Sequence, residues 1–178
     1  MEKRIQEARK CLDNGLYEAA LALALTLPDI CGQVEYPAIK KVGERYTKWI
    51  DNLVDPKALY DQSFDEFGDF KHLESQDIYK LRCAFLHSGD QDISSDTIDY
   101  FNLVRPNGLG AVEGKASFGY KYGIEKQPDG SVKNTAQIDI KYLTEMICDA
   151  AEEYYKTKSP SDFEEHTFAL MCKYLAVQ

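Results

Sequence analysis

Apolar residues in the first half of the chain recur every three or four positions, which is the spacing of one buried helical face. Asn14-Gly15 and Ser88-Gly89 are typical ends for the first and last of these helices, and Pro28 is expected to kink or end the second. Pro37 is predicted to be the first residue of the third helix, and residues 56–73 predict a short helix and a loop. The four apolar stripes consist of Ile5, Ala8 and Leu12; Leu16, Ala19, Ala20, Leu23 and Leu27; Val42, Tyr46, Trp49, Ile50 and Leu53; and Ile78, Leu81, Phe85 and Leu86.

The period changes to alternation between residues 97 and 140, which indicates β-strands. Strands are predicted around residues 98–104, 118–124 and 132–140, and Gln127-Pro128-Asp129-Gly130 is a strong turn signal between the last two. This pattern predicts a small antiparallel sheet of two or three strands. Because an isolated hairpin is marginally stable in water, the sheet is expected to pack on the helices or on a partner.

The chain ends in a helical pattern. Apolar residues from Leu143 to Tyr154 return at three- and four-residue spacing, Ser159-Pro160 interrupts them, and Ser161 with Glu164 predicts a capping box for a last helix. The fold class is therefore predicted to be mainly α. Residues 1–178 are expected to form one helical-bundle domain, with a small antiparallel hairpin or sheet inserted near residues 97–140.

Composition and charge exclude several functional classes. The chain of 178 residues has 21 Lys and Arg against 30 Asp and Glu, and its net charge of −9 does not attract nucleic acid in bulk. The longest apolar run, residues 19–25, is far short of the roughly 20 residues needed to span a bilayer. No signal peptide is recognisable, and five singly placed cysteines favour reduced thiols over a disulfide framework. We expect a cytoplasmic protein without membrane contact.

The three histidines restrict the chemistry that the chain can perform. His72 and His166 have no second histidine or cysteine at helical ligand spacing, and no C-x-x-C pair occurs, so neither a metal site nor a cofactor is expected. The sequence also lacks G-x-S-x-G, P-loop, G-x-G-x-x-G and H-E-x-x-H motifs. The sequence therefore contains none of the motifs that usually identify serine hydrolases, nucleoside-triphosphatases and zinc proteases.

His87 differs from the other two histidines because Arg82 precedes it near the end of an apolar-faced helix. An imidazole, with an ordinary pKa of about 6.5, can take the proton of a ribose 2′-hydroxyl or give one to the leaving oxygen. A guanidinium is permanently charged, so it can hold the phosphate and stabilise the charge that grows in the transition state. Such a pair can cleave RNA without a metal, leaving a 2′,3′-cyclic phosphate and a 5′-hydroxyl.

The spacing of this pair imposes a geometric condition. In an ideal α-helix, five residues place Arg82 and His87 about 140° apart, so the two side chains do not share a face. Either the helix end distorts, or two copies of the helix pool their pairs across a two-fold axis. We favour the second arrangement, because an isologous dimer brings two arginines and two histidines into one cleft.

The stretch LRCAFLHSG (residues 81–89) resembles the motif helix of the HEPN family, the higher eukaryotes and prokaryotes nucleotide-binding domain. In that family an arginine is followed after a few residues by a histidine, as Arg82 is by His87. The resemblance covers the helical residues 1–90 and 140–178. It implies a helical bundle, a homodimer whose cleft holds the motif, and metal-independent endoribonuclease activity on single-stranded RNA. It also implies a toxin–antitoxin or antiphage defence setting, with an antitoxin-like partner protein.

An alternative is a catalytically inactive module of the same fold that dimerises, binds a nucleotide or contacts another protein. Family members that cleave RNA usually carry a polar residue directly after the motif arginine, where this chain has Cys83. In this interpretation Arg82 pairs with an acid such as Asp90, and His87 caps the carbonyl groups at the helix end.

Further residues are candidates for substrate binding at the same site. Asp90 follows the motif and Tyr79 precedes it, while Asp29, Glu35 and Tyr36 lie near the predicted kink, where they are expected to orient His87 or line a cleft. Solvent exposure or helix capping is the alternative for these residues. Candidates for phosphate contact are the basic residues Lys40, Lys41, Arg45 and Lys48, for which a solvated helix face is the alternative. Candidates for base stacking are the strand residues Tyr120, Lys121 and Tyr122, for which sheet packing is the alternative.

Overall fold

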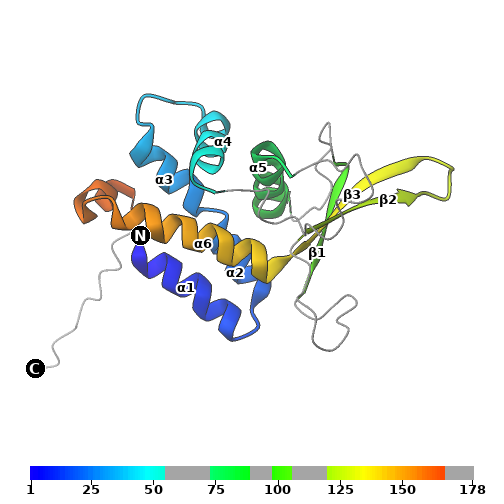
Figure 1. Ribbon diagram of the computed structural model, residues 1–178, viewed down its shortest axis with the longest axis horizontal. Helices are drawn as coiled ribbons and strands as arrows, with labels where there is room; N and C mark the ends of the chain where they lie inside the picture. The colour runs from blue at the N-terminus through cyan, green and yellow to red at the C-terminus, as the bar shows by residue number, and fades with distance from the viewer. Residues whose placement is uncertain (55–72, 89–97, 106–119, 167–178) are drawn as a thin grey trace, which may run out of the picture.

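The computed structural model describes residues 1–54, 73–88, 98–105 and 120–166. This part of the chain is mainly helical with one small sheet, so the predicted fold class is confirmed (Figure 1). The helices are α1 (Glu2–Asp13), α2 (Tyr17–Ala24), α3 (Leu27–Glu35), α4 (Val42–Leu53), α5 (Ser75–Cys83) and α6 (Ile140–Lys156), with a π-turn η3 (Ala84–Ser88) and a 3-10 turn η4 (Pro160–His166). The strands are β1 (Tyr100–Val104), β2 (Tyr120–Lys126) and β3 (Val132–Asp139).

Helix α6 is the central element of the bundle, because α1, α2 and α3 all pack against it (Figure 1). Its buried face includes Leu143, Ile147 and Ala151, as the apolar stripe predicts. Trp49 of α4 meets Tyr154 of α6 edge-on, with ring centroids 6.0 Å apart. The N-terminal helices and the helix after the sheet therefore share one core.

Local chemistry sets the helix boundaries. Gly15 follows α1 with a φ of +72°, a left-handed conformation that glycine adopts without strain. The change of axis expected at Pro28 occurs just before it, because Pro28 lies in the first turn of α3, where a missing N–H breaks no helical hydrogen bond. Pro37 does not begin a helix, so that prediction is wrong. It lies in a turn closed by the Ile39 N–H on the Tyr36 carbonyl (3.0 Å), and α4 begins only at Val42.

The buried face of α2 is rotated from the predicted stripe. Ala20, Leu21 and Ala24 are buried, whereas Leu16 is 57 % exposed and precedes the helix as its N-cap. Ala19 is also exposed. Because α2 lies against both α1 and α6, its buried strip is set by two neighbours at once, and an almost wholly apolar helix offers several equivalent faces.

The sheet has the strand order β1-β3-β2 and is mixed. The predicted antiparallel hairpin of β2 and β3 is confirmed, with Gly130 in its turn at a φ of +84°. The prediction is wrong for β1, which pairs with β3 in parallel, from Tyr100 opposite Thr135 to Val104 opposite Asp139. Alternation of apolar residues predicts which face of a strand is buried, but the direction of a strand depends on the path of its connection.

Both ends of α6 are tied to their neighbours by polar caps. Asp139, the last residue of β3, accepts the backbone N–H groups of Lys141 (2.8 Å) and Tyr142 (3.1 Å), so the strand leads directly into the helix. After α6, the Ser159 N–H donates to the carboxylate of Asp162 at 3.0 Å, and η4 begins at Pro160. Ser161 therefore lies inside η4, and the predicted cap position at Ser161 is wrong. The predictions for residues 56–72 and for the helix beyond residue 166 lie outside the described residues.

Candidate functional site

Arg82 lies where α3, α4 and α5 meet, and its guanidinium is turned into the bundle. Only 15 % of the side chain is exposed. Its Nη2 lies 3.8 Å from Oδ2 of Asp29 on α3, and its Nη1 lies 3.9 Å from Sγ of Cys83. The ion pair is long compared with the roughly 2.7–2.9 Å of a charge-assisted hydrogen bond. By its contacts with the described residues, the guanidinium is therefore enclosed but loosely held.

Asp29 is shared between two arginines. Its Oδ1 accepts a hydrogen bond from Nη2 of Arg45 at 2.8 Å, while its Oδ2 faces Arg82. Arg45 is fixed more firmly, because its Nη1 also donates to the Ile39 carbonyl at 3.1 Å and its side chain packs closely on Gly32, where a Cβ would lie 3.0 Å from it. We call Asp29, Arg45 and Arg82 the arginine cluster. Two guanidiniums against one carboxylate give this cluster one net positive charge.

Two buried N–H groups of the arginine cluster have no hydrogen-bond acceptor within the part of the chain that the structure describes. The Nε atoms of Arg45 and Arg82 are buried, and neither has an acceptor among the residues that the structure describes. A buried donor without an acceptor costs about 1–3 kcal/mol. Such groups are unusual in folded proteins.

Two tyrosines flank the Arg82 guanidinium. The rings of Tyr46 and Tyr79 have centroids 5.3 Å apart, and the guanidinium carbon lies 5.9 Å and 6.0 Å from them, at the limit of a cation–π contact. Burial raises the pKa of both phenols, and the hydrogen bond between Tyr79 and Cys83 raises that of Tyr79 further. Both phenols therefore stay neutral, and the Tyr46 hydroxyl donates a hydrogen bond to the Leu25 carbonyl at 3.1 Å.

His87 is exposed and lies in the π-turn η3, which directly continues α5. The helix end is therefore distorted within a single chain, which is one of the two arrangements that the spacing of Arg82 and His87 allows. A π-turn joins residues five apart by its hydrogen bonds, so it holds more residues per turn than an α-turn. The wider turn reduces the angle of about 140° that an ideal α-helix places between Arg82 and His87. Pooling of two such pairs in a homodimer stays a prediction.

The other predicted site residues of α3 are held by different partners. The carboxylate of Glu35 accepts the Tyr154 hydroxyl at 2.8 Å and pairs with Lys158 at 2.7 Å. The Tyr36 hydroxyl accepts a hydrogen bond from Asn52 at 2.9 Å. Six residues, about 9 Å of helical rise, separate Glu35 from Asp29. Of the α3 candidates, only Asp29 is therefore placed at Arg82, and Glu35 joins α3 to the end of α6.

Replacing Glu35 by glutamine is expected to remove a pH-dependent part of the stability. Lys158, and then Tyr154, lower the pKa of the Glu35 carboxyl. A carboxyl whose pKa is depressed on folding stabilises the protein above its unfolded pKa, and that contribution is lost as the pH falls through the folded pKa. Chemical denaturation between about pH 5 and about pH 2 should show a smaller loss of stability for Glu35→Gln than for wild type.

The exposed Glu164 provides the control for this experiment, because Glu164→Gln changes the same chemical group outside the Glu35 contacts. Its stability should fall with acidification as much as that of wild type. An equal loss in Glu35→Gln and wild type would contradict the assigned role of the Glu35 carboxylate.

The remaining candidates are dispersed or fall outside the described residues. The basic stretch does not form one continuous face, because Arg45 is turned inward and the Lys48 Nζ lies over the Tyr36 ring, 4.7 Å from its centroid. The four described cysteines are free thiols, and no three His, Cys, Asp or Glu side chains gather as metal ligands in the described ranges. Outside the description lie Asp90, His72 and the side chains of Tyr120, Lys121, Tyr122 and His166.

Comparisons with known proteins leave the family open. No protein-family model, no curated protein and no solved structure matches this chain. In the described part of the chain, no helix has the length and apolar character that a membrane span requires.

Proposed function

We propose that this protein is a metal-independent endoribonuclease of the HEPN type that cuts single-stranded RNA. The observation that carries the proposal is the net positive charge of the arginine cluster, whose Arg82 lies five residues before the exposed imidazole of His87. On a chain with a net charge of −9, such a local cation is what a phosphodiester requires. The loose contact between Arg82 and Asp29 leaves the guanidinium able to exchange this carboxylate for a phosphate.

In this mechanism Arg82 holds the non-bridging oxygens of the scissile phosphate and stabilises the charge that grows on them. His87 takes the proton of the ribose 2′-hydroxyl. The 2′-oxygen then forms a bond to phosphorus while the bond from phosphorus to the 5′-oxygen breaks. The 5′-oxygen leaves with a proton from water or from the imidazole of a second copy. The products are a 2′,3′-cyclic phosphate and a 5′-hydroxyl.

The resemblance to HEPN proteins also supports a biological setting for this activity. We propose a cytoplasmic homodimer that acts in a toxin–antitoxin or antiphage defence system and is restrained by an antitoxin-like partner protein. A nuclease that attacks cellular RNA must be held inactive until it is needed. No cofactor or metal takes part in this scheme.

A catalytically inactive module of the same fold is the second candidate function, and a specific observation favours it. The acid opposite Arg82 among the described residues is Asp29, and the guanidinium is mostly buried with it. A buried ion pair of this kind can have a purely structural role in the bundle, without any part in catalysis. Cys83, which replaces the usual polar residue after the motif arginine, also favours the inactive module. Such a module would bind a nucleotide or a protein partner without cleaving RNA.

An RNA cleavage assay separates the two candidates. Wild-type protein, Arg82→Ala and His87→Ala are incubated with labelled single-stranded RNA in EDTA, beside Arg105→Ala, which removes an arginine whose side chain is 71 % exposed. Wild type and Arg105→Ala should release fragments ending in a 2′,3′-cyclic phosphate, and the two motif variants should not. Equal cleavage by all four proteins would assign the activity to another site or to a contaminant, and the nuclease proposal would fall.

A further inference from the structure

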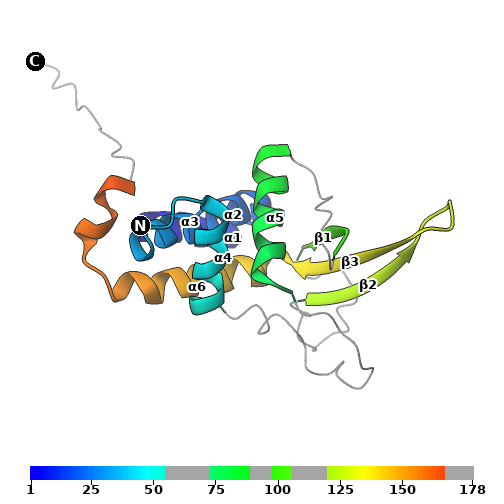
Figure 2. The same cartoon turned by 90° about the horizontal axis from the view of Figure 1, so that it is seen from above.

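The two arginines that share the carboxylate of Asp29 are held very differently. Helix α4 lies between α3 and α5, and Arg45 on α4 and Arg82 on α5 both approach Asp29 on α3 (Figures 1 and 2). Arg45 donates to Oδ1 of Asp29 at 2.8 Å and to the Ile39 carbonyl at 3.1 Å, and its side chain packs against Gly32. These two hydrogen bonds have ordinary lengths for their kind. Arg45 is therefore an anchored partner of Asp29.

Arg82, in contrast, has contacts only at the outer limit of their kind among the described residues. Its Nη2 lies 3.8 Å from Oδ2 of Asp29, and its Nη1 lies 3.9 Å from Sγ of Cys83. The ring centroids of Tyr46 and Tyr79 lie 5.9 Å and 6.0 Å from the guanidinium carbon, where cation–π attraction ends. The buried Nε of Arg82 has no acceptor in the same part of the chain. The guanidinium therefore loses little binding energy when it leaves this position.

Departure of Arg82 does not leave the Asp29 carboxylate without a partner. Removing one partner of a buried ion pair is usually costly, because the other charge stays behind uncompensated. Here Oδ1 of Asp29 keeps its 2.8 Å hydrogen bond from Arg45, and the pair that remains is electrically neutral. The charge that leaves is the one net positive charge of the arginine cluster. The interior therefore tolerates two positions of the Arg82 guanidinium, one on Asp29 and one turned outward.

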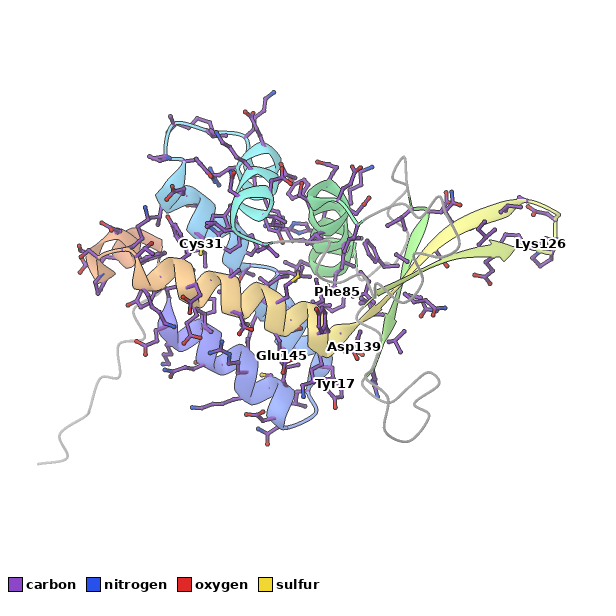
Figure 3. All side chains as sticks on the ribbon, in the orientation of Figure 1. Tyr17, Cys31, Phe85, Lys126, Asp139 and Glu145 are labelled. Atoms are coloured by element: carbon purple, nitrogen blue, oxygen red, sulfur yellow. The ribbon has the colours of Figure 1, made fainter. Side chains whose placement is uncertain are left out.

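The exposure of His87 gives the outward position of Arg82 a use. His87 is exposed in η3, whereas only 15 % of the Arg82 side chain is exposed. Figure 3 labels Cys31 on α3 and Phe85 in η3, and these two residues locate the elements that carry Asp29 and His87. An RNA backbone reaches exposed groups. A phosphate therefore meets both motif side chains only when the Arg82 guanidinium has turned away from Asp29.

We propose that Asp29 is an internal competitor of the RNA phosphate for Arg82, and that the structure holds the site in its inhibited, resting state. A carboxylate and a phosphodiester each carry one negative charge, and both accept N–H groups of a guanidinium. RNA binding moves Arg82 from Asp29 to a non-bridging phosphate oxygen, while Arg45 retains Asp29. No covalent bond changes in this exchange. The inference rests on the proposed function, because it concerns the regulation of the same site.

This competition lowers the affinity for RNA without affecting the chemical step. Only the fraction of molecules with Arg82 released binds the phosphate, so the apparent dissociation constant rises in inverse proportion to that fraction. In Asp29→Asn the amide oxygen still accepts a hydrogen bond from Arg45, but the charge that attracts Arg82 is gone. We expect KM for RNA to fall about 3–5-fold, the contribution of a long and partly exposed ion pair, with kcat unchanged.

The binding test uses a fluorescent single-stranded deoxyoligonucleotide, which has phosphodiesters but no 2′-hydroxyl and is therefore not cut. Anisotropy titrations compare wild type, Asp29→Asn, Arg82→Met and the double variant, and circular dichroism checks their folding. Asp29→Asn should bind about 3–5-fold more tightly than wild type, and the gain should vanish in the Arg82→Met background. Asp13→Asn is the matched control, because it removes the same charge from an exposed aspartate on α1 and should bind like wild type.

A second measurement uses the unaltered protein, so it does not depend on how well the variants fold. The side-chain Nε–H resonances of the arginines are followed by NMR while the deoxyoligonucleotide is added, with Arg82→Met identifying the Arg82 signal. The Arg82 signal should shift on binding, and the Arg45 signal should not, because Arg45 keeps Asp29 throughout. An unmoved Arg82 signal in a protein that binds the probe would overturn the exchange.

The outcomes separate this inference from the nuclease proposal. If wild type cuts RNA but Asp29→Asn binds the probe no more tightly than Asp13→Asn, the competition is refuted and the nuclease stands. If the gain in binding appears without any cleavage of RNA, the competition stands and the nuclease falls. A gain that persists in the Arg82→Met background would assign the effect to Arg45 and overturn the inference, as would a probe that binds none of the proteins.

Discussion

Replacing His87 by alanine is expected to lower the rate of RNA cleavage by about 10²–10⁴-fold, the usual contribution of a positioned general acid or base. The same substitution should leave the thermal unfolding temperature unchanged, because the side chain is exposed at the end of the helical segment. Single-turnover cleavage of a labelled RNA and a thermal melt of the same preparation measure the two quantities. A loss of activity without a loss of stability is the expected signature of a residue that acts in the chemistry.

His87→Gln is the matched control, because glutamine keeps a hydrogen-bonding group of similar reach but does not exchange protons at neutral pH. It should be as inactive as His87→Ala. If glutamine restored most of the rate, His87 would only bind the RNA or cap the helix end. Full activity in both variants would remove the imidazole from the mechanism altogether.

The helices were predictable because helical periodicity is a local property of the sequence. The stripes also contained a signal about the site. Arg45 stands three residues after Val42 and four before Trp49, and Arg82 stands four after Ile78, so both arginines occupy inward positions of apolar faces. A charge on such a face needs an acidic partner inside the protein.

The identity of that acidic partner was not predictable from spacing alone. Asp29 lies on a different helix, and several acids were available along the chain; the sequence indicated Asp90 as readily. Which carboxylate meets Arg82 depends on how α3, α4 and α5 pack, and the close approach at Gly32 brings α3 and α4 together. For the same reason β1 was predicted as a strand but not as the parallel partner of β3.

Replacing Asp29 by alanine is expected to lower the free energy of unfolding by about 2–3 kcal/mol, toward the low end of the cost of breaking a buried ion pair, because 21 % of its side chain is exposed. The variant leaves Arg45 and Arg82 facing each other without a carboxylate between them. Equilibrium denaturation at low and high salt measures the effect. Added salt should recover part of the loss, because counterions then screen the two guanidiniums.

Double-mutant cycles on Asp29 test whether the charge of Arg82 is neutralised inside the protein or is available to bind a phosphate. The 2.8 Å contact predicts a strong coupling between Asp29→Asn and Arg45→Met, and the 3.8 Å contact predicts a much weaker one between Asp29→Asn and Arg82→Met. In that case Arg45 neutralises Asp29, and Arg82 is the cation left over for a phosphate. If Arg82 carried the larger coupling energy, its charge would be consumed inside the protein. The bundle would then be stabilised by Arg82, and the inactive module would be the better account of this chain.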